Sequence, residues 1–172
     1  MKSKSIGIAG LLLVAAMGSS AVAAESDIIR TAKDRAEIES LMWRYVRALD
    51  TFNADAYAAT YTPDGQFGSG ANAPRGREAL AKMITDLRQR SAANETKSGQ
   101  KPAPMYHVLA NSYLEFVDKD HAPMEAYWMT VFGAAGQETP ARVAAAGREV
   151  DQLVELLPRY VAKCLQGIRT AD

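Results

Sequence analysis

The pattern of apolar and polar positions divides the chain into a helical first half and a strand-rich second half. Between Thr31 and Leu49, apolar residues recur at spacings of three and four, which predicts an amphipathic helix that ends at Asp50. A short second helix is predicted from about Asn53 to Tyr61, because Asn53 or Asp55 can cap its start. The segment from Arg77 to Arg90 repeats the helical spacing. Pro63-Asp64-Gly65 predicts a turn, and Ser91 to Pro104 predicts a polar surface loop.

After Pro104 the spacing changes from helical to alternating. Met105 to Val117 alternates with a period of two, and Asp118-Lys119-Asp120 has the composition of a hairpin turn. Three further strands are predicted, at Met124–Phe132, Ala141–Leu156 and Arg159–Ile168. Helices followed by consecutive strands with short connections predict an α+β domain with a strongly curved antiparallel sheet.

Asp50 stands where a carboxylate is electrostatically unfavourable. The C-terminus of a helix carries a partial negative charge, so Lys, Arg or Gly is the stabilising choice there. His107, on the first predicted strand, is a residue type that removes protons near neutral pH, since its ordinary pKa is about 6.5. A carboxylate hydrogen-bonded to one ring nitrogen fixes the tautomer and raises the basicity of the other. Asp50 can orient His107 in this way if the predicted helix ends beside the strand that carries His107, with the two side chains within hydrogen-bonding distance and on one cavity.

The first 24 residues have the features of a signal peptide. Lys2 and Lys4 precede an apolar run from Ile6 to Met17, and small residues around Ala21-Val22-Ala23-Ala24 suit cleavage. The run is shorter than the roughly 20 residues that a transmembrane helix needs, which leaves an uncleaved anchor as the weaker alternative. We expect residues 25–172 to form one domain that is exported to the periplasm or secreted, with no membrane attachment after signal removal.

Charge and cysteine content exclude several classes of function. Without the first 24 residues the chain has 18 basic and 20 acidic side chains, a balance that argues against nucleic acid as a partner. Cys164 is the only cysteine, so no internal disulfide and no cysteine-based zinc site can form. The two histidines lack paired ligand spacing, and neither a phosphate-binding loop nor a nucleophile elbow is present. These patterns predict neither a metal nor a cofactor.

Four segments carry a family resemblance: AEIESLMWRYVRALDTFNADAYAATYTPDGQF, RGREAL, YHVLANSYLEF and AAAGREVDQLVE, in that order. Together they resemble the SnoaL-like branch of the nuclear transport factor 2-like (NTF2-like) superfamily. That resemblance implies a cone in which helices close a bent sheet around a pocket. The resemblance implies one of several functions found in that group, namely that of a lyase, an isomerase, a hydrolase or a non-catalytic binding or assembly domain. It also implies a tendency to form homo-oligomers. Asp50 and His107 match an Asp and a His of several lyases in this group, and Tyr45 matches a Tyr of the steroid dehydratase-like members. Cys164 falls near the place of a late Arg in the dehydrochlorinase-like members, which argues against loss of halide.

The combined hypothesis is a lyase that needs no cofactor and acts on a small apolar ring compound. His107 is the predicted base, Asp50 orients it, and Tyr45 is a candidate acid, while Tyr61 and Trp128 are predicted to contact the substrate. Elimination of water is the preferred reaction, and isomerisation uses the same groups. Each of these residues also has a purely structural explanation. Asp50 is a residue type that is common where helices end, and His107 could be a hydrogen-bonded core residue. Tyr45 could serve only to pack the core. An exported binding domain without turnover and a pure assembly module are the competing functions.

Overall fold

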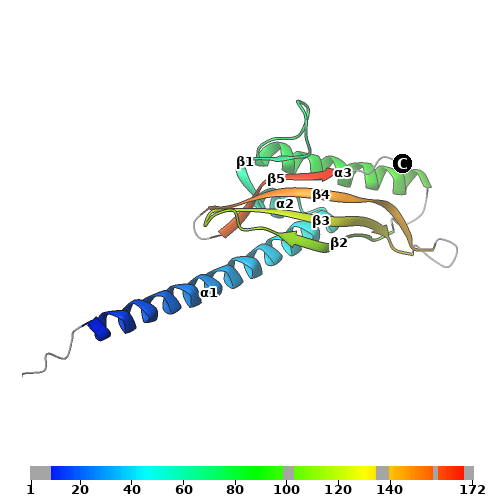
Figure 1. The fold of residues 1–172 in the computed structure, drawn as a ribbon. Helices are drawn as coiled ribbons and strands as arrows, with labels where there is room; N and C mark the ends of the chain where they lie inside the picture. The colour runs from blue at the N-terminus through cyan, green and yellow to red at the C-terminus, as the bar shows by residue number, and fades with distance from the viewer. Residues whose placement is uncertain (1–8, 99–102, 135–139, 157–158, 169–172) are drawn as a thin grey trace, which may run out of the picture. The chain divides into compact units, whose positions relative to one another are not determined.

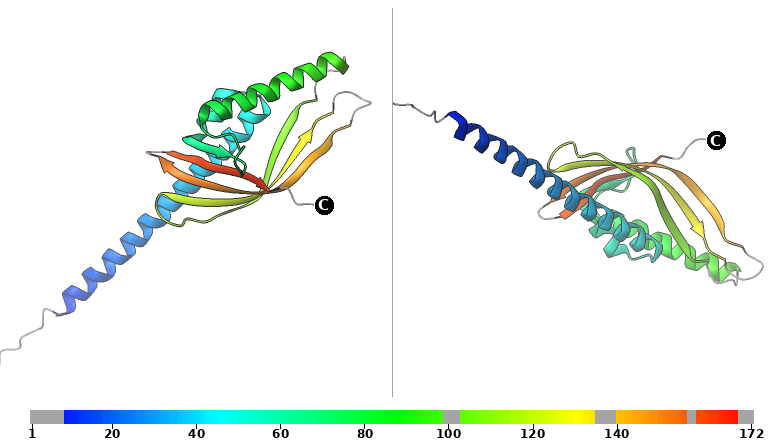
Figure 2. Two further views of the ribbon diagram at one scale, coloured as in Figure 1. Left: turned by 90° about the horizontal axis from the view of Figure 1, so that it is seen from above. Right: turned by 60° about the horizontal axis from the view of Figure 1, so that its bottom comes forward.

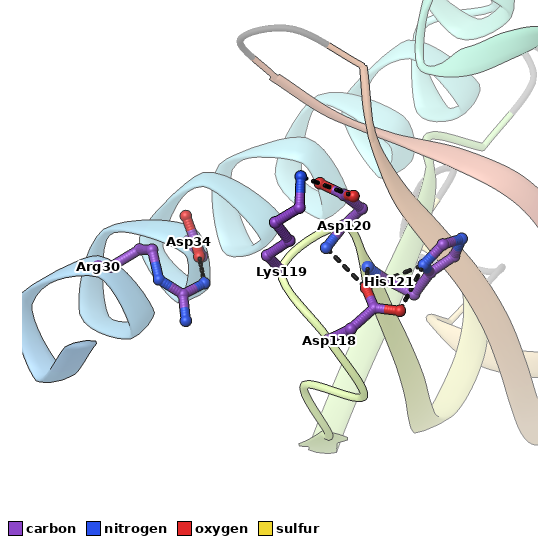
Figure 3. Close-up of polar contacts among 6 residues, drawn as sticks. All are labelled: Arg30, Asp34, Asp118, Lys119, Asp120 and His121. Atoms are coloured by element: carbon purple, nitrogen blue, oxygen red, sulfur yellow. Dashed lines mark hydrogen bonds and ion pairs between the residues drawn. The ribbon is translucent and has the colours of Figure 1, made fainter.

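The computed structural model of the protein describes residues 9–98, 103–134, 140–156 and 159–168. Its chain forms two compact units, residues 1–36 and 37–172, which are described separately. Helix α1 (Ala9–Asp50) begins in the first unit, where Arg30 pairs with Asp34 one turn later at 3.5 Å (Figure 3). None of the described helices is both long and apolar enough to cross a membrane. The predicted signal peptide lies in this unit and stays a prediction.

The second unit is built on a five-stranded sheet with the order β1-β5-β4-β3-β2 (Figure 1). Its strands are β1 (Tyr61–Phe67), β2 (Met105–Leu114), β3 (His121–Phe132), β4 (Arg142–Leu156) and β5 (Arg159–Ile168). Strands β2 to β5 pair antiparallel with their neighbours along the chain, as their short connections predict. Helices α2 (Ala54–Ala59) and α3 (Arg77–Ser98) lie on the concave side of the bent sheet (Figure 2). The predicted α+β architecture is confirmed.

One core joins these helices to the inner face of the sheet. The apolar face of α1 from Ile38 to Leu49 is buried, as its spacing predicts, and α3 contributes Leu80 and Ile84. The sheet adds alternate residues of two central strands, since side chains two apart share a face: Ala122, Met124, Ala126 and Leu153. The core therefore lies against the end of the sheet where β3 begins and β4 ends.

Three predicted boundaries were wrong. Helix α1 does not begin near Thr31, because no proline interrupts the preceding residues from Ala9 onward. Helix α3 continues to Ser98 through Ala92, Ala93 and Glu95, which favour helix, so most of the predicted surface loop is helical. Helix α2 ends at Ala59, and Asn53 is its cap, accepting a hydrogen bond from the Ala56 N–H.

The predicted turn at Pro63-Asp64-Gly65 lies inside strand β1 instead. This strand is at the edge of the sheet and pairs with β5 in parallel, so the predicted antiparallel sheet contains a parallel pair. Its register shifts between Tyr61 and Gln66, across the proline. An edge strand tolerates proline because a missing N–H does not break a ladder there.

Strand β2 changes the face of its side chains partway along its length. Between Ala110 and Tyr113 the register with β3 slips, and Asn111 adopts a left-handed φ of 50°. A bulge of this kind adds one residue to one strand. The inner face therefore carries Met105, His107 and Leu109 before the bulge and Leu114 after it, whereas strict alternation predicted Leu114 on the outer face.

Candidate functional site

The structure brings Asp50 and His107 together from opposite halves of the second unit. His107 Nδ1 lies 2.7 Å from Asp50 Oδ1, and the backbone N–H of His107 donates to the same oxygen at 2.9 Å. Both side chains are mostly enclosed, with 17% of the imidazole and 13% of the carboxylate exposed. The pair is therefore held by two hydrogen bonds in a place where water screens it only in part.

The local backbone explains why each partner is available. Strand β2 lies at the edge of the sheet, so the backbone N–H groups that point away from β3 have no strand to bond to. Asp50 accepts the hydrogen bond from one of them, the N–H of His107. The end of α1 is closed by bonds from Phe52 N–H to Leu49 O and from Asn53 N–H to Ala48 O. These two bonds form a Schellman-type end with Phe52 in the left-handed conformation (φ 51°). Asp50 is thus the last residue of the helix and is held rigidly beside β2.

The hydrogen bonds decide the protonation pattern of the imidazole. An ionised carboxylate only accepts hydrogen bonds, so Nδ1 carries the proton and Nε2 of His107 keeps its lone pair. When Nε2 takes up a proton, the imidazolium lies beside both the carboxylate and the negative end of α1. Each of these stabilises a positive charge, the helix end by about 0.3–1 kcal/mol. The arrangement suits a general base.

Tyr45 and Tyr61 lie in a cluster of three tyrosines with Tyr57. The rings are 5.3–6.4 Å apart between centroids, and the hydroxyls of Tyr57 and Tyr61 are 2.8 Å apart. Burial is the main cause that raises the pKa of Tyr45 and Tyr61 well above 10, so both phenols stay protonated. Tyr61 has no exposed surface, and the hydroxyl of Tyr45 is hydrogen-bonded to Tyr57. The roles predicted for these two residues, as acid and as substrate contact, stay predictions.

Two acidic residues that the sequence analysis did not select lie near this cluster on β4. Glu149 and Asp151 are buried, and their charges raise the pKa of Tyr45 and Tyr57 further. Burial also raises the pKa of Glu149 to about 7. The sequence could have indicated that both side chains point to the inner face, because they fall on the same alternate positions of the strand as Leu153, an inner-face residue.

Burial divides the inner face of the sheet into two halves. The closed half, packed against the core, consists of Leu114, Ala122, Met124, Ala126, Glu149, Asp151 and Leu153. The open half, whose residues are partly exposed, consists of Met105, His107, Leu109, Trp128, Thr130, Phe132, Ala145 and Gly147. Trp128, predicted to contact substrate, belongs to the same open half as His107. A separate hollow of about 390 Å³ between α1 and α2 is lined by neither Asp50 nor His107.

The other histidine forms a pair in a solvent-exposed turn. His121 Nδ1 lies 2.9 Å from Asp118 Oδ1, and the N–H groups of Asp120 and His121 donate to the same carboxylate (Figure 3). Both side chains are more than half exposed. Within the described parts of the chain, no group of three or more His, Cys, Asp or Glu side chains is placed to hold a metal ion. The side chain of Cys164 lies outside the described residues.

The bent sheet with its helices on the concave side defines an α+β protein of the NTF2-like class. The chain belongs to the SnoaL-like family, because the model of the SnoaL-like domain matches residues 30–156. This match confirms the family that the sequence motifs indicated. No curated protein matches the chain.

Several solved structures share the fold at low identity. A variant of a Mycobacterium tuberculosis protein of unknown function is 20% identical with a TM-score of 0.68, covering 84% of this chain and 76% of that one. An NTF2-like protein with a cystatin-like fold from Novosphingobium aromaticivorans is 18% identical with a TM-score of 0.68, covering 84% and 86%. A proposed scytalone dehydratase from the same organism is 18% identical with a TM-score of 0.65, covering 84% and 89%. At this identity the likeness shows the fold alone.

Proposed function

We propose that this SnoaL-like protein is a lyase that eliminates water from a small apolar ring compound. The observation that carries the proposal is the 2.7 Å contact between His107 Nδ1 and Asp50 Oδ1, which leaves Nε2 as the basic nitrogen. Asp50 orients the imidazole and stabilises the imidazolium that forms during proton removal. The proposed role needs no group other than side chains of this protein.

In the proposed reaction, Nε2 of His107 takes a proton from the carbon next to the one that bears a hydroxyl. The electron pair of the broken C–H bond forms a carbon–carbon double bond, and the C–O bond breaks. The departing hydroxyl takes one proton and leaves as water, so atoms and charges balance. The imidazolium of His107 can return that proton, and Tyr45 is the second candidate donor, because its phenol stays protonated. Isomerisation follows if the proton instead returns to another carbon.

The substrate class rests on the open half of the inner face. His107 shares this surface with Met105, Leu109, Trp128 and Phe132, which are apolar or aromatic and suit a flat ring compound. A structural neighbour proposed to be a scytalone dehydratase and another proposed to be an aromatic ring hydroxylase point to the same substrate class. Tyr61 is fully buried and its hydroxyl lies 2.8 Å from that of Tyr57, and its contact with the substrate stays part of the proposal.

Proton removal can be tested before the natural substrate is known. 2-Tetralone is a bicyclic ketone with acidic hydrogens next to its carbonyl, and a base at Nε2 should exchange them with deuterated water. We expect the wild type to accelerate this exchange, measured by proton NMR, and His107→Gln to lose the acceleration while it remains folded. Equal exchange rates with the two proteins would remove His107 as the base. A thermal-shift screen of hydroxylated ring compounds then identifies ligands, because binding stabilises the native state.

A binding domain without turnover is the second candidate. The half-exposed apolar surface around Trp128 serves ligand binding equally well with or without chemistry. The discriminating result is a compound that raises the melting temperature of the wild type and of His107→Gln equally, yet is converted by neither. Export to the periplasm or outside the cell remains part of the proposal, and a fractionation experiment on the full chain tests it.

Assembly into a homo-oligomer is proposed from the outer face of the sheet. Tyr106, Val108, Tyr127, Met129 and Val143 are exposed apolar residues on adjacent strands of that face, a pattern that a partner surface commonly covers. We expect a dimer of this chain in sedimentation velocity, converted to a monomer by Tyr127→Glu. A monomeric wild type contradicts this proposal.

A further inference from the structure

Two polar atoms of the inner face are buried without a hydrogen-bond partner among the described residues. They are the indole Nε1 of Trp128 and the Oε1 of Glu149. Glu149 is only 5% exposed, so its carboxyl has little access to water. A buried polar group that lacks a partner destabilises the native state, which makes each such group a signal for a ligand that satisfies it.

The register of the sheet places the two residues next to each other. Trp128 pairs with Gly147, and Ala126 pairs with Glu149, so Trp128 and Glu149 are diagonal neighbours on adjacent strands. Diagonal neighbours on one face are roughly 7–8 Å apart, within reach of long side chains. Gly147 has no side chain, so nothing from β4 stands directly opposite the indole. One small group can therefore contact both the indole N–H and the carboxyl.

The same register connects this pair to the candidate base. His107 pairs with Thr130 on β3, which makes it a diagonal neighbour of Trp128 on the other side. His107, Trp128 and Glu149 thus form a diagonal row across three adjacent strands, all on the inner face. The row crosses the boundary between the open and the closed half, with His107 and Trp128 in the open half and Glu149 at the edge of the closed half.

We propose that Trp128 and Glu149 bind an oxygen atom of the ligand, a ring carbonyl or hydroxyl, beside the ring carbon that faces His107. This inference rests on the proposed function, because it names the substrate of that site more closely. The ligand class is a flat, multi-ring compound that is apolar along its length and carries a neutral oxygen beside that carbon. Trp128 is a binding residue in this account. Glu149 determines the preference for a ligand that carries this oxygen over one that has only hydrogen at the same position.

The chemistry of the two groups suits a neutral oxygen. The indole N–H only donates, so it requires an acceptor such as a carbonyl or hydroxyl oxygen. Glu149 has its pKa raised to about 7 by burial, so near neutral pH a large share of molecules carry a protonated carboxyl that can donate as well. Tyr45 of α1 and Tyr57 of α2 interact electrostatically with Glu149, and Asp151 follows it on the same face of β4, so none of these neighbours carries a positive charge that favours an anionic ligand.

A matched pair of ligands tests the inference. 2-Tetralone and tetralin share one ring skeleton and differ by the carbonyl oxygen, and calorimetry or ligand-observed NMR gives the affinity of the intact protein for each. We expect the wild type to bind 2-tetralone about tenfold more tightly, the effect of roughly one net hydrogen bond. Trp128→Phe keeps an aromatic ring without the N–H, and Glu149→Leu removes the carboxyl, so each should reduce the preference to less than about threefold. Glu149→Gln keeps a hydrogen-bonding amide and should retain most of it.

Tyr127→Phe is the control, because it removes a hydroxyl from the neighbouring residue on the outer face and should leave the tenfold preference unchanged. Circular dichroism shows whether each variant is folded, and Glu149→Gln remains informative if Glu149→Leu is not. Equal affinities of the wild type for the two compounds, no binding of either, or an unchanged preference in Trp128→Phe overturns the inference. A protein that shows the preference but does not exchange deuterium retains this oxygen-binding site and loses the lyase proposal, so the two failures are distinguishable.

Discussion

The protein contains two His–Asp pairs with nearly the same hydrogen bonds. In both pairs the Nδ1 of the histidine contacts Oδ1 of the aspartate, at 2.7 Å for His107–Asp50 and 2.9 Å for His121–Asp118. In both, the backbone N–H of the histidine donates to the same oxygen, at 2.9 and 2.8 Å. Judged by the contacts of Nδ1 alone, the two imidazoles have the same tautomer and the same orienting carboxylate.

What separates the pairs is their surroundings. The His121–Asp118 pair belongs to one turn, with residues three apart and both side chains more than half exposed. The His107–Asp50 pair joins a helix end to a strand 57 residues later and is largely enclosed. Exposed ion pairs contribute little because water screens them, whereas enclosed ones interact strongly. A His–Asp contact therefore indicates a candidate catalytic pair only where it is enclosed and faces a surface that a ligand can reach.

The largest expected difference concerns turnover. His107→Gln should lower kcat of the proposed elimination by about 10²–10⁴-fold, the usual contribution of a general base, while His121→Gln should leave it unchanged. The measurement is kcat on a substrate found in the ligand screen, with melting temperatures to show that both variants are folded. If the two variants behave alike, the difference between the pairs has no catalytic meaning.

A smaller difference concerns stability. Asp50→Ala leaves two donors of His107 without an acceptor in a partly buried place, which destabilises by about 1.5–3 kcal/mol for a charged acceptor. Relief of the unfavourable helix-end charge offsets about 0.3–1 kcal/mol of this, so we expect a net loss of about 2 kcal/mol in urea unfolding. Asp118→Ala should leave the urea midpoint nearly unchanged, because water replaces the lost acceptor. An equal loss in both variants would show that burial does not distinguish the pairs.

The smallest effect concerns acid stability of the exposed pair. Hydrogen bonds, first from the Asp120 N–H and then from the His121 side chain, lower the pKa of Asp118 below its usual 3.8. A lowered carboxyl pKa contributes stability above the unfolded value of 3.8, and this contribution is lost as the pH falls through the folded pKa. Asp118→Asn should therefore melt slightly below the wild type at pH 5, and the difference should shrink at pH 2.5. A difference that grows toward low pH contradicts the lowered pKa.

The sequence predicted the Asp50–His107 contact because two independent signals coincided. Asp50 was out of place at the end of a strongly periodic helix, and the family resemblance supplied a partner on the first long strand. The periodicity of α1 from Ile38 to Leu49 was also enough to identify the core face of that helix. Strongly periodic patterns predict the buried face correctly because burial of that face dominates the energetics of such elements.

The features that the sequence analysis predicted wrongly or missed share a cause, because each depends on contacts between distant segments, which a local sequence pattern does not show. Pro63-Asp64-Gly65 forms an edge strand because β5 pairs with it, and β5 lies about a hundred residues further along the chain. The bulge at Asn111 reverses the face of Leu114, which alternation alone assigns to the outer face. The sequence did not show that Glu149 and Trp128 are neighbours, because this follows only from the β3–β4 register.

The separation of 57 residues between Asp50 and His107 also has a kinetic consequence. The His121–Asp118 contact closes a loop of three residues and can form as soon as the turn forms. The His107–Asp50 contact requires a long loop to close, which is entropically less favourable, and it requires β2 to be docked beside the end of α1. We therefore expect the His107–Asp50 pair, the proposed base and its orienting group, to assemble late during folding. Recovery of the proposed activity during refolding should then follow the recovery of the helical signal.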